Sequence, residues 1–541
     1  MPNPVKYSPE AESNSLRIGD LNIGTNHTPK GPTSTTGFFG GVNPPGNGYT
    51  IYLNKLSDGP SILVASNDAE LIVMTNQIAA TSYTTVNECL SYFASQIDKC
   101  ALNKIVSEIA TDNLNIFLDA GNTLSYPKNG SIMYDVSGKG NNATFYNSTT
   151  FDDEYIVFDG VDDYGGITNN NTLQGWNTAQ TISTWVNHNI ASGRRNIWNQ
   201  AYGGYGTWTH EQGGGVSYYF GDAGSNNQPY VGRGSSAIPK NRWTLVTSTR
   251  DITTQKWYIN QNNTQTTSNP FGVLATTTAD CLIGYGYTGT YWAGKMSKMM
   301  TWDKALTPDE INTIFYGSSI VTDGLTFAID AGVLGSYESG DTTAYSQIST
   351  PGVGFINGTL GNGVAFNKSN GGYWEFDGVD DKITLTNNIT VGNGNVNWSV
   401  SAWVKSTTTV NGLGQGPIMT NDGSGPVYSV MSINAGKICY WTYQSSAWAQ
   451  KLGVATVNDG QWHHLTWVNY DNSTMDMYVD GVFDKNITNS TSGNNNPLDS
   501  IGASWTAFFD GEIACLQMYD RKALSPDEVQ QNYNTQVNRF N

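Results

Sequence analysis

The sequence has few charged residues: Asp, Glu, Lys and Arg together make up 13% of its 541 positions, and only 27 positions are Lys or Arg. Acidic residues outnumber basic ones, which leaves a net charge of -18. Proteins bind nucleic acid mainly through Lys and Arg side chains that displace counterions from the phosphates. We therefore expect no nucleic-acid partner, and an acidic surplus by itself chiefly keeps a protein soluble.

Cysteine and long apolar runs are scarce as well. The five cysteines are odd in number and lack CxxC spacing, which argues against a zinc site and a disulfide framework; they are Cys89, Cys100, Cys281, Cys439 and Cys515. No segment supplies the roughly 18 consecutive apolar residues of a membrane span. The first residues lack the basic region and apolar core of a secretory signal. We expect synthesis in the cytoplasm and no membrane partner.

Glycine and aromatic residues are plentiful by contrast. Glycine occupies 60 positions and aromatic residues make up 12% of the chain. This balance is typical of many strands joined by tight turns, so we expect an all-β protein. A chain of this length exceeds what one hydrophobic core usually organises, which predicts two or three domains.

Two distant parts of the chain repeat each other. FDGVDD at Phe158 returns at Phe376, 218 positions later. The run over residues 281–311 parallels residues 499–529, and intervening motifs keep the same order. A spacing of roughly 215 residues is much longer than any solenoid repeat. A whole domain has therefore been duplicated in tandem.

Each copy is predicted to consist of two packed antiparallel β-sheets. TISTWV from Thr181 and SVSAWV from Ser399 alternate small polar residues with Ile, Val and Trp, as in a strand with one buried face. A short helix is expected at the end of each copy. Thr307 and Ser525 each precede a Pro and a Glu that completes a capping box.

We divide the chain into residues 1–107, a first sandwich over 108–318 and a second over 319–541. The first part is expected to be a small α+β domain, with strands in YTIYLNKL and SILVAS. Apolar residues three or four positions apart predict a long helix near residues 85–109. This helix either packs on the strands of its own domain or joins copies of itself in a homo-oligomer, a dimer or a trimer.

The repeated motifs resemble laminin-G-like domains of the concanavalin-A-type jelly-roll fold. The resemblance rests on LDAGN, FDGVDDY, the strand with W-V and, above all, GKMSKMMTWDKALTPDEI, and it covers most of both copies. Residues 37–100 are similar to structural proteins of marine cyanophage myoviruses. This implies a protein on the exterior of a virion, anchored to other virion proteins through residues 1–107.

The repeated acidic turn has a structural and a metal-binding interpretation. Asp159 and Asp377 are expected to accept hydrogen bonds from turn amides, and the Val that follows each Asp-Gly is expected to return to the core. The later carboxylates are candidate calcium ligands; they are Asp162, Asp163, Asp380 and Asp381. The structural role is the stronger interpretation, so no cofactor is required and calcium, where bound, would be structural.

No catalytic residues are predicted. Glu375, Asp377 and Asp380 lie at positions similar to those of the acid and the nucleophile in jelly-roll glycanases. The first copy, however, has Val157 in place of Glu375. The sequence also lacks the GxSxG, Walker and HExxH motifs. We therefore expect a protein that is not an enzyme.

Aromatic residues in segments rich in Gly, Asn and Gln are candidates for carbohydrate binding, because such rings stack on sugars while amides bond to hydroxyls. The candidates are Trp198, Tyr202, Tyr205, Trp208, Tyr219, Tyr230, Trp441, Trp448 and Trp505. We expect adhesion to a host-surface glycan. The alternatives are a decoration or fibre protein that contacts only other virion proteins and, less favoured, an enzyme that degrades polysaccharide.

Overall fold

A computed structural model describes five strands between Lys6 and Ala65 and most of residues 110–540. The positions after residue 110 that it leaves undescribed are 111, 123–124, 153, 174–177, 191–192, 201–205, 211–213, 220–229, 234–236, 269–278, 287–288, 392–396, 411, 413–415, 422–428, 445–446, 471–473, 489–495 and 541. The chain divides into two compact units, Met1–Val106 and Ser107–Asn541. None of the described helices has the length and hydrophobicity of a membrane-spanning segment.

The first unit contains one antiparallel sheet with the strand order β1-β5-β4-β3-β2. Its strands are β1 Lys6–Tyr7, β2 Ser15–Ile18, β3 Leu21–Gly24, β4 Tyr49–Lys55 and β5 Gly59–Ala65. The strands β4 and β5 confirm the two strand segments predicted here. The helix predicted near residues 85–109 lies outside the described residues.

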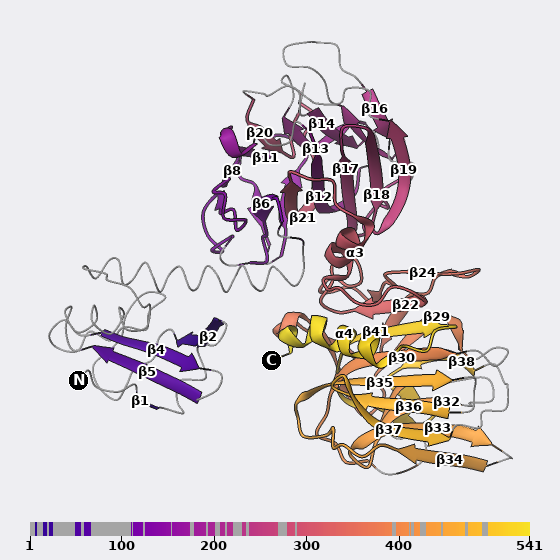
Figure 1. Ribbon diagram of the computed structural model, residues 1–541. Helices are drawn as coiled ribbons and strands as arrows, with labels where there is room; N and C mark the ends of the chain where they lie inside the picture. Colours follow the sequence, from indigo (N-terminus) through magenta and orange to yellow (C-terminus); the bar gives the residue numbers. More distant parts are fainter. Residues whose placement is uncertain are drawn as a thin grey trace. The chain divides into compact units, whose positions relative to one another are not determined.

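The first half of the second unit is a sandwich of two antiparallel sheets (Figure 1). One sheet has the order β9-β10-β21-β12-β17-β18-β19, with β6 also paired to β21; the other has the order β7-β8-β11-β20-β13-β14-β15-β16. The strands are β6 Leu114–Leu118, β7 Ile132–Met133, β8 Ala143–Tyr146, β9 Thr150–Phe151, β10 Ile156–Asp159, β11 Tyr164–Ile167, β12 Gln180–His188, β13 Arg195–Gln200, β14 Gly206–His210, β15 Val216–Tyr219, β16 Tyr230–Arg233, β17 Thr244–Arg250, β18 Thr254–Ile259, β19 Asn262–Ser268, β20 Cys281–Ile283 and β21 Ala293–Trp302.

The second half is another sandwich of two antiparallel sheets. One sheet has the order β27-β28-β41-β30-β35-β36-β37, with β22 also paired to β41; the other has the order β23-β26-β29-β38-β31-β32-β33-β34. The strands are β22 Leu325–Asp330, β23 Thr343–Ala344, β24 Ser349–Thr350, β25 Gly354–Phe355, β26 Gly358–Gly361, β27 Ala365–Asn367, β28 Tyr373–Asp377, β29 Lys382–Val391, β30 Trp398–Lys405, β31 Pro417–Thr420, β32 Ser429–Asn434, β33 Lys437–Gln444, β34 Ala447–Leu452, β35 Trp462–Tyr470, β36 Thr474–Val479, β37 Val482–Thr488, β38 Asn496–Ile501, β39 Ala503–Ser504, β40 Ala507–Phe508 and β41 Asp510–Asp520.

The two sandwiches have the same topology. Strand for strand, β9-β10-β21-β12-β17-β18-β19 in the first corresponds to β27-β28-β41-β30-β35-β36-β37 in the second, and the opposing sheets correspond in the same way. The β6–β21 pair is matched by the β22–β41 pair. This agreement confirms the predicted tandem β-sandwiches.

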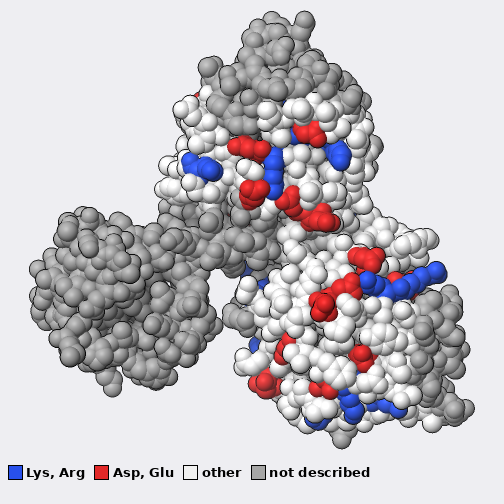
Figure 2. Space-filling model, in the orientation of Figure 1, with Lys and Arg blue, Asp and Glu red and all other residues white. Residues whose placement is uncertain are grey.

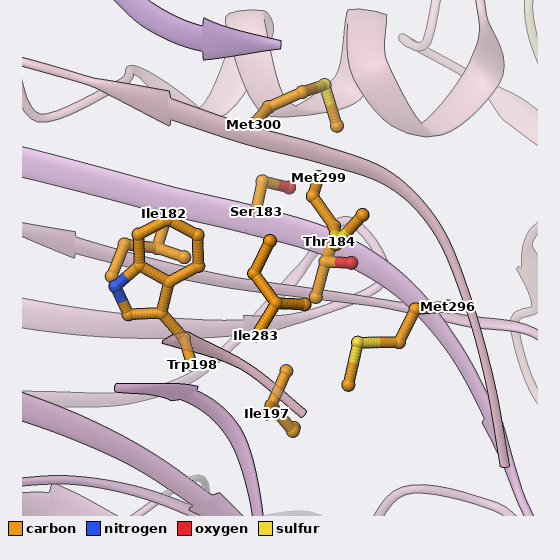
Figure 3. Close-up of a pocket in the computed structure, with 9 residues that line it drawn as sticks. All are labelled: Ile182, Ser183, Thr184, Ile197, Trp198, Ile283, Met296, Met299 and Met300. Atoms are coloured by element: carbon orange, nitrogen blue, oxygen red, sulfur yellow. The ribbon is translucent and has the colours of Figure 1, made fainter. Parts of the chain in front are cut away.

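Each core lies between the two sheets and is built from the inward positions of the alternating strands. Ile182 and Val186 of β12 lie in the core of the first sandwich, and Val400 and Val404 of β30 lie in that of the second. Burying each such side chain contributes about 1.5–3 kcal/mol. The first core contains a cavity of about 10 Å³, close to the least space that holds one water molecule, and Figure 3 shows the residues that line it.

A short helix follows the last strand of each sandwich: α3 spans Pro308–Tyr316 and α4 spans Pro526–Gln536. Both begin with the predicted capping box, formed by Thr307 with Glu310 and by Ser525 with Glu528. Ring contacts join α3 to β12 and α4 to β30; the pairs are Trp185 with Phe315 at 5.7 Å and Trp403 with Tyr533 at 5.6 Å between centroids. The short helices η3 Ser369–Gly371 and η4 Val537–Arg539 complete the second sandwich.

Candidate functional site

The two FDGVDD turns are held by the same hydrogen bonds. In the second sandwich, Oδ1 of Asp377 accepts from the backbone N–H of Val379 at 2.8 Å and of Asp380 at 3.4 Å, and Oδ2 of Asp381 accepts from the N–H of Asp377 at 3.0 Å. The first sandwich repeats these three bonds at 2.8, 3.3 and 3.0 Å. The expected role of the first Asp of each motif in forming the turn is confirmed.

The expectation that the Val of this motif returns to the core is wrong. Val161 and Val379 are 69% and 68% exposed, whereas Asp163 and Asp381 are only 5% and 3% exposed. The reason is that a carboxylate at the buried position accepts the backbone N–H at the start of the turn. A Val side chain cannot do this, and an unpaired buried N–H is costly.

Each turn gathers three carboxylates whose oxygens lie within 4.8 Å of one another; the groups are Asp159, Asp162 and Asp163, and Asp377, Asp380 and Asp381. Two oxygen ligands at 2.3–2.6 Å from one calcium ion can lie up to about 5 Å apart. The structure therefore brings the predicted carboxylates together and adds one Asp to each group.

One buried carboxylate oxygen in each turn lacks a hydrogen-bond partner in the described part of the chain. The Oδ1 atoms of Asp163 and Asp381 are buried and make no hydrogen bond among the described residues. Burial raises the pKa of both carboxyls, and their neighbouring Asp residues add to the effect. A set of oxygen donors with an unpartnered buried member fits a hard cation such as calcium, which would neutralise the repulsion within the turn.

The aromatic candidates of the first sandwich do not form a described site. Trp198 is 3% exposed and lies in the core, beside the cavity in Figure 3. Its ring is therefore not available to stack on a ligand. The side chains of the other candidates lie outside the described residues; they are Tyr202, Tyr205, Trp208, Tyr219 and Tyr230.

The aromatic candidates of the second sandwich come together at one edge of a sheet. Trp441 lies on β33 and Trp448 on the edge strand β34, and both contact an apolar cluster around Val430. Trp505 lies at the turn of the β39–β40 hairpin. Its ring meets that of Trp448 edge to face, with 5.9 Å between centroids and 90° between planes. We call Trp441, Trp448 and Trp505 the aromatic patch.

Exposure increases across the aromatic patch. Trp441 is 8% exposed, Trp448 is half-buried and Trp505 is 48% exposed. Trp505 also has a φ of 53°, a left-handed conformation that is unusual for a bulky residue. Backbone strain of this kind is concentrated at functional sites. A large ring is thus presented to solvent at a position where Gly or Asn would be easier to accommodate.

Polar groups accompany the rings. Gln450 is in register with Trp441 across the β33–β34 pair, so their side chains share a face. Its Nε2 donates to Oδ1 of Asn434 at 2.8 Å. The Nε1–H of Trp441 is buried and has no hydrogen-bond partner among the described residues, although a buried indole N–H usually has one. The groups of the aromatic patch that reach solvent are therefore the rings of Trp448 and Trp505, with the amide of Gln450 beside Trp441, all of them uncharged, whereas the ring and the N–H of Trp441 are buried.

A family model described as the concanavalin A-like lectin/glucanases superfamily matches residues 159–312 and 377–530, together more than half of the chain. One similar solved structure is domain 4 of AbnA, an extracellular GH43 arabinanase from Geobacillus stearothermophilus, in complex with arabinotriose. It has 18% identity and a TM-score of 0.31, and the match covers 38% of this chain and 98% of that chain.

Another similar structure is the binding domain of botulinum neurotoxin DC in complex with SialylT. It has 11% identity and a TM-score of 0.34, and the match covers 74% of this chain and 98% of that chain. A structure from work on botulinum neurotoxin type C, whose cell entry depends on interaction with two ganglioside molecules, has 10% identity and a TM-score of 0.35; the match covers 79% of this chain and 97% of that chain. No curated protein matches the chain.

Proposed function

This chain belongs to the concanavalin A-like lectin/glucanases superfamily, and we propose that it is a carbohydrate-binding adhesion protein of a bacteriophage particle. Residues 1–107 anchor it to other virion proteins. The two sandwiches are displayed on the particle exterior and contact glycans of the host surface. The resemblance of residues 37–100 to cyanophage structural proteins supports the virion context, and the aromatic patch supports glycan binding.

The main support for glycan binding is the exposed ring of Trp505. Its ring is 48% exposed at a left-handed turn position and is braced edge-on by Trp448. An exposed indole face stacks on the apolar face of a sugar ring without needing a charge. Figure 2 shows charged side chains in small separate groups, with most of the described surface in view uncharged. These features favour a neutral ligand over a polyanion.

A single shallow site of this kind would bind weakly. Linked sites gain about a hundredfold or more in avidity when several are engaged at once. A particle that carries many copies therefore adheres firmly even when each glycan contact is weak. Adhesion of this kind requires no catalytic residue, and we expect no enzymatic activity.

The test compares the full-length protein with its Trp505→Ala variant on a glycan array and in adsorption to host cells. Phe483→Ala is the matched control, because Phe483 is 54% exposed at a hairpin of the opposite sheet. We expect Trp505→Ala to weaken glycan binding at least tenfold and Phe483→Ala to leave it unchanged. Equal binding by wild type and Trp505→Ala would refute the aromatic patch as the site.

A second experiment separates adhesion from decoration. Particles that carry the protein without residues 108–541 should assemble but adsorb poorly to host cells. Unchanged adsorption would favour a protein that contacts only other virion proteins. Incubation of the full-length protein with host envelope glycans should release no new reducing ends; their release would indicate an enzyme instead.

A further inference from the structure

A pocket of about 300 Å³ lies on the second sandwich, where β28 and β30 end and β41 begins. It is separate from the aromatic patch, which lies on the other sheet. Three carboxylates and one ammonium group line it: Glu375, Asp510, Glu512 and Lys405. The carboxylates are thus in excess over the single cation.

Three of these residues form one cross-strand row. Glu512 on β41 lies directly opposite Glu375 on β28 and, on its other side, opposite Lys405 on β30. We call Glu375, Glu512 and Lys405 the acidic row. Like charges directly opposite each other destabilise a sheet. Lys405 compensates only one of the two, since its Nζ lies 3.0 Å from Oε1 of Glu512.

In the described part of the chain, each carboxylate of the pocket uses only one of its two oxygens as a hydrogen-bond acceptor. Oε1 of Glu375 accepts from Nδ2 of Asn367 at 3.0 Å, and Oδ2 of Asp510 accepts from Oγ1 of Thr408 at 2.6 Å. Within the described part of the chain, the second oxygen of each of the three carboxylates makes no hydrogen bond. Three acceptors therefore remain for a ligand that carries several N–H donors.

The first sandwich shows what this position accepts. The corresponding row is Val157, Lys295 and Asn187. Nζ of Lys295 lies 2.5 Å from Oε1 of Glu338, and Nδ2 of Asn187 donates to Oε2 of Glu338 at 3.4 Å. Glu338 belongs to the segment that follows β22 and is largely buried by these contacts. The row thus receives an inserted side chain of the opposite charge.

We propose that the acidic row receives the Lys or Arg side chain of a basic segment of another protein. The charge of the row is reversed relative to the first sandwich, because Glu375 stands in place of Val157 and Glu512 in place of Lys295. The side chain that binds there is therefore expected to be positively charged. An Arg guanidinium suits the site best because its donors form a planar fork that can bond two carboxylates. This inference goes beyond glycan binding and does not depend on it.

Two other occupants fit less well. A second copy of this chain carries a net charge of -18, which opposes approach to an acidic pocket. A metal ion needs carboxylate oxygens close together, and among the described residues such groups occur only in the two acidic turns. A guanidinium group, whose N–H donors point to several acceptors, suits the separate carboxylates of the pocket better than a second copy or a metal ion does.

The experiment titrates a fluorescent hexa-arginine peptide into the full-length protein at physiological salt and measures anisotropy. Glu375→Val and Glu512→Lys introduce the residues that the first sandwich has at these positions. The control is Asp323→Asn, which removes one negative charge at a side chain 80% exposed outside the pocket. Thermal unfolding of every variant shows that the fold is intact.

We expect wild type and Asp323→Asn to bind the peptide equally and the two pocket variants to bind at least tenfold more weakly. Equal binding by all four proteins would mean diffuse charge attraction and would overturn the proposal. So would the absence of binding by wild type at physiological salt. Sedimentation gives an independent check, since a dimer that Glu512→Lys dissociates would identify a second copy as the occupant and overturn it too.

Discussion

Glu512 faces Glu375 across the β28–β41 pair, at the register position where Lys295 faces Val157 in the first sandwich. The glycines that follow in register are alike, with φ values of 146° at Gly511 and 142° at Gly294. The backbone at this position is therefore alike in both copies, while the side chains next to it differ in charge. Duplication has left one scaffold with two different outer surfaces.

The ion pair of the first sandwich can be tested by charge reversal. Lys295→Glu places two carboxylates together at a half-buried site and is expected to lower the free energy of unfolding by about 1–3 kcal/mol. The double variant Lys295→Glu with Glu338→Lys should restore most of the loss. Urea denaturation of wild type, of the two single variants Lys295→Glu and Glu338→Lys and of the double variant measures the coupling, and the absence of any restoration would contradict a direct pairing of the two side chains.

The strained turn at Trp505 predicts a difference between two small replacements. Trp505→Gly and Trp505→Ala both remove the ring, so both should lose glycan binding. Gly tolerates a φ of 53° far better than Ala, and Trp505→Gly should therefore be more stable than Trp505→Ala by about 1 kcal/mol. Denaturation midpoints check this, and equal stability of the two variants would argue against backbone strain at this position.

The buried His464 predicts sensitivity to acid. Its ring is fully buried beside Trp403, and burial lowers its pKa from 6.5 to about 4. Between these pH values His464 is protonated in the unfolded chain but neutral in the folded chain. The free energy of unfolding therefore decreases by about 3 kcal/mol as pH falls from about 6.5 to 4.

The matched variant for this effect is His464→Leu, because the first sandwich has Leu245 at the corresponding position. The variant should lose much less stability than wild type between pH 7 and pH 4.5. The neighbouring His463 acts in the opposite sense: burial lowers its pKa, but Asp480 and Asp459 outweigh this and raise it. It thus stabilises the fold below pH 6.5, and this contribution is lost as pH rises through its raised pKa. An equally steep loss of stability at acid pH in wild type and in His464→Leu would exclude His464 as the source of the effect.

Calcium is expected to stabilise the acidic turns. Millimolar calcium should raise the thermal midpoint of the wild type, because it would neutralise three clustered carboxylates and give a ligand to each buried Oδ1. The double variant Asp163→Asn with Asp381→Asn should show a much smaller rise. Magnesium serves as the control, since it sheds its water reluctantly. A midpoint that does not respond to calcium would leave the turns a purely structural role.

The sequence was sufficient to predict the duplicated sandwich fold because the relevant signals are local or periodic. Alternation in strands such as β12 and β30 and the capping boxes at Thr307 and Ser525 each follow from a few neighbouring residues. The exception is the FDGVDD turn, where hydrophobicity predicted a buried Val. There the requirement of a backbone N–H for an acceptor outweighed the burial of one apolar side chain.

The candidate sites were predictable only in part, because they depend on the pairing of distant strands. Trp441, Trp448 and Trp505 were all identified from composition, but their grouping needs the β39–β40 hairpin to return to the edge of the sheet. Glu375 and Glu512 are more than a hundred positions apart in the chain. Nothing local specifies that they face each other, since register is set by the whole sheet.

The pairing of β6 with β21 and of β22 with β41 places the first and last strands of each sandwich next to each other. The polypeptide therefore enters and leaves each sandwich at adjacent places. A domain whose two ends are adjacent can be inserted into a loop of another protein, deleted or duplicated without changing the chain path of the neighbouring domains. Each sandwich is thus suited to duplication and exchange as one continuous segment of the gene.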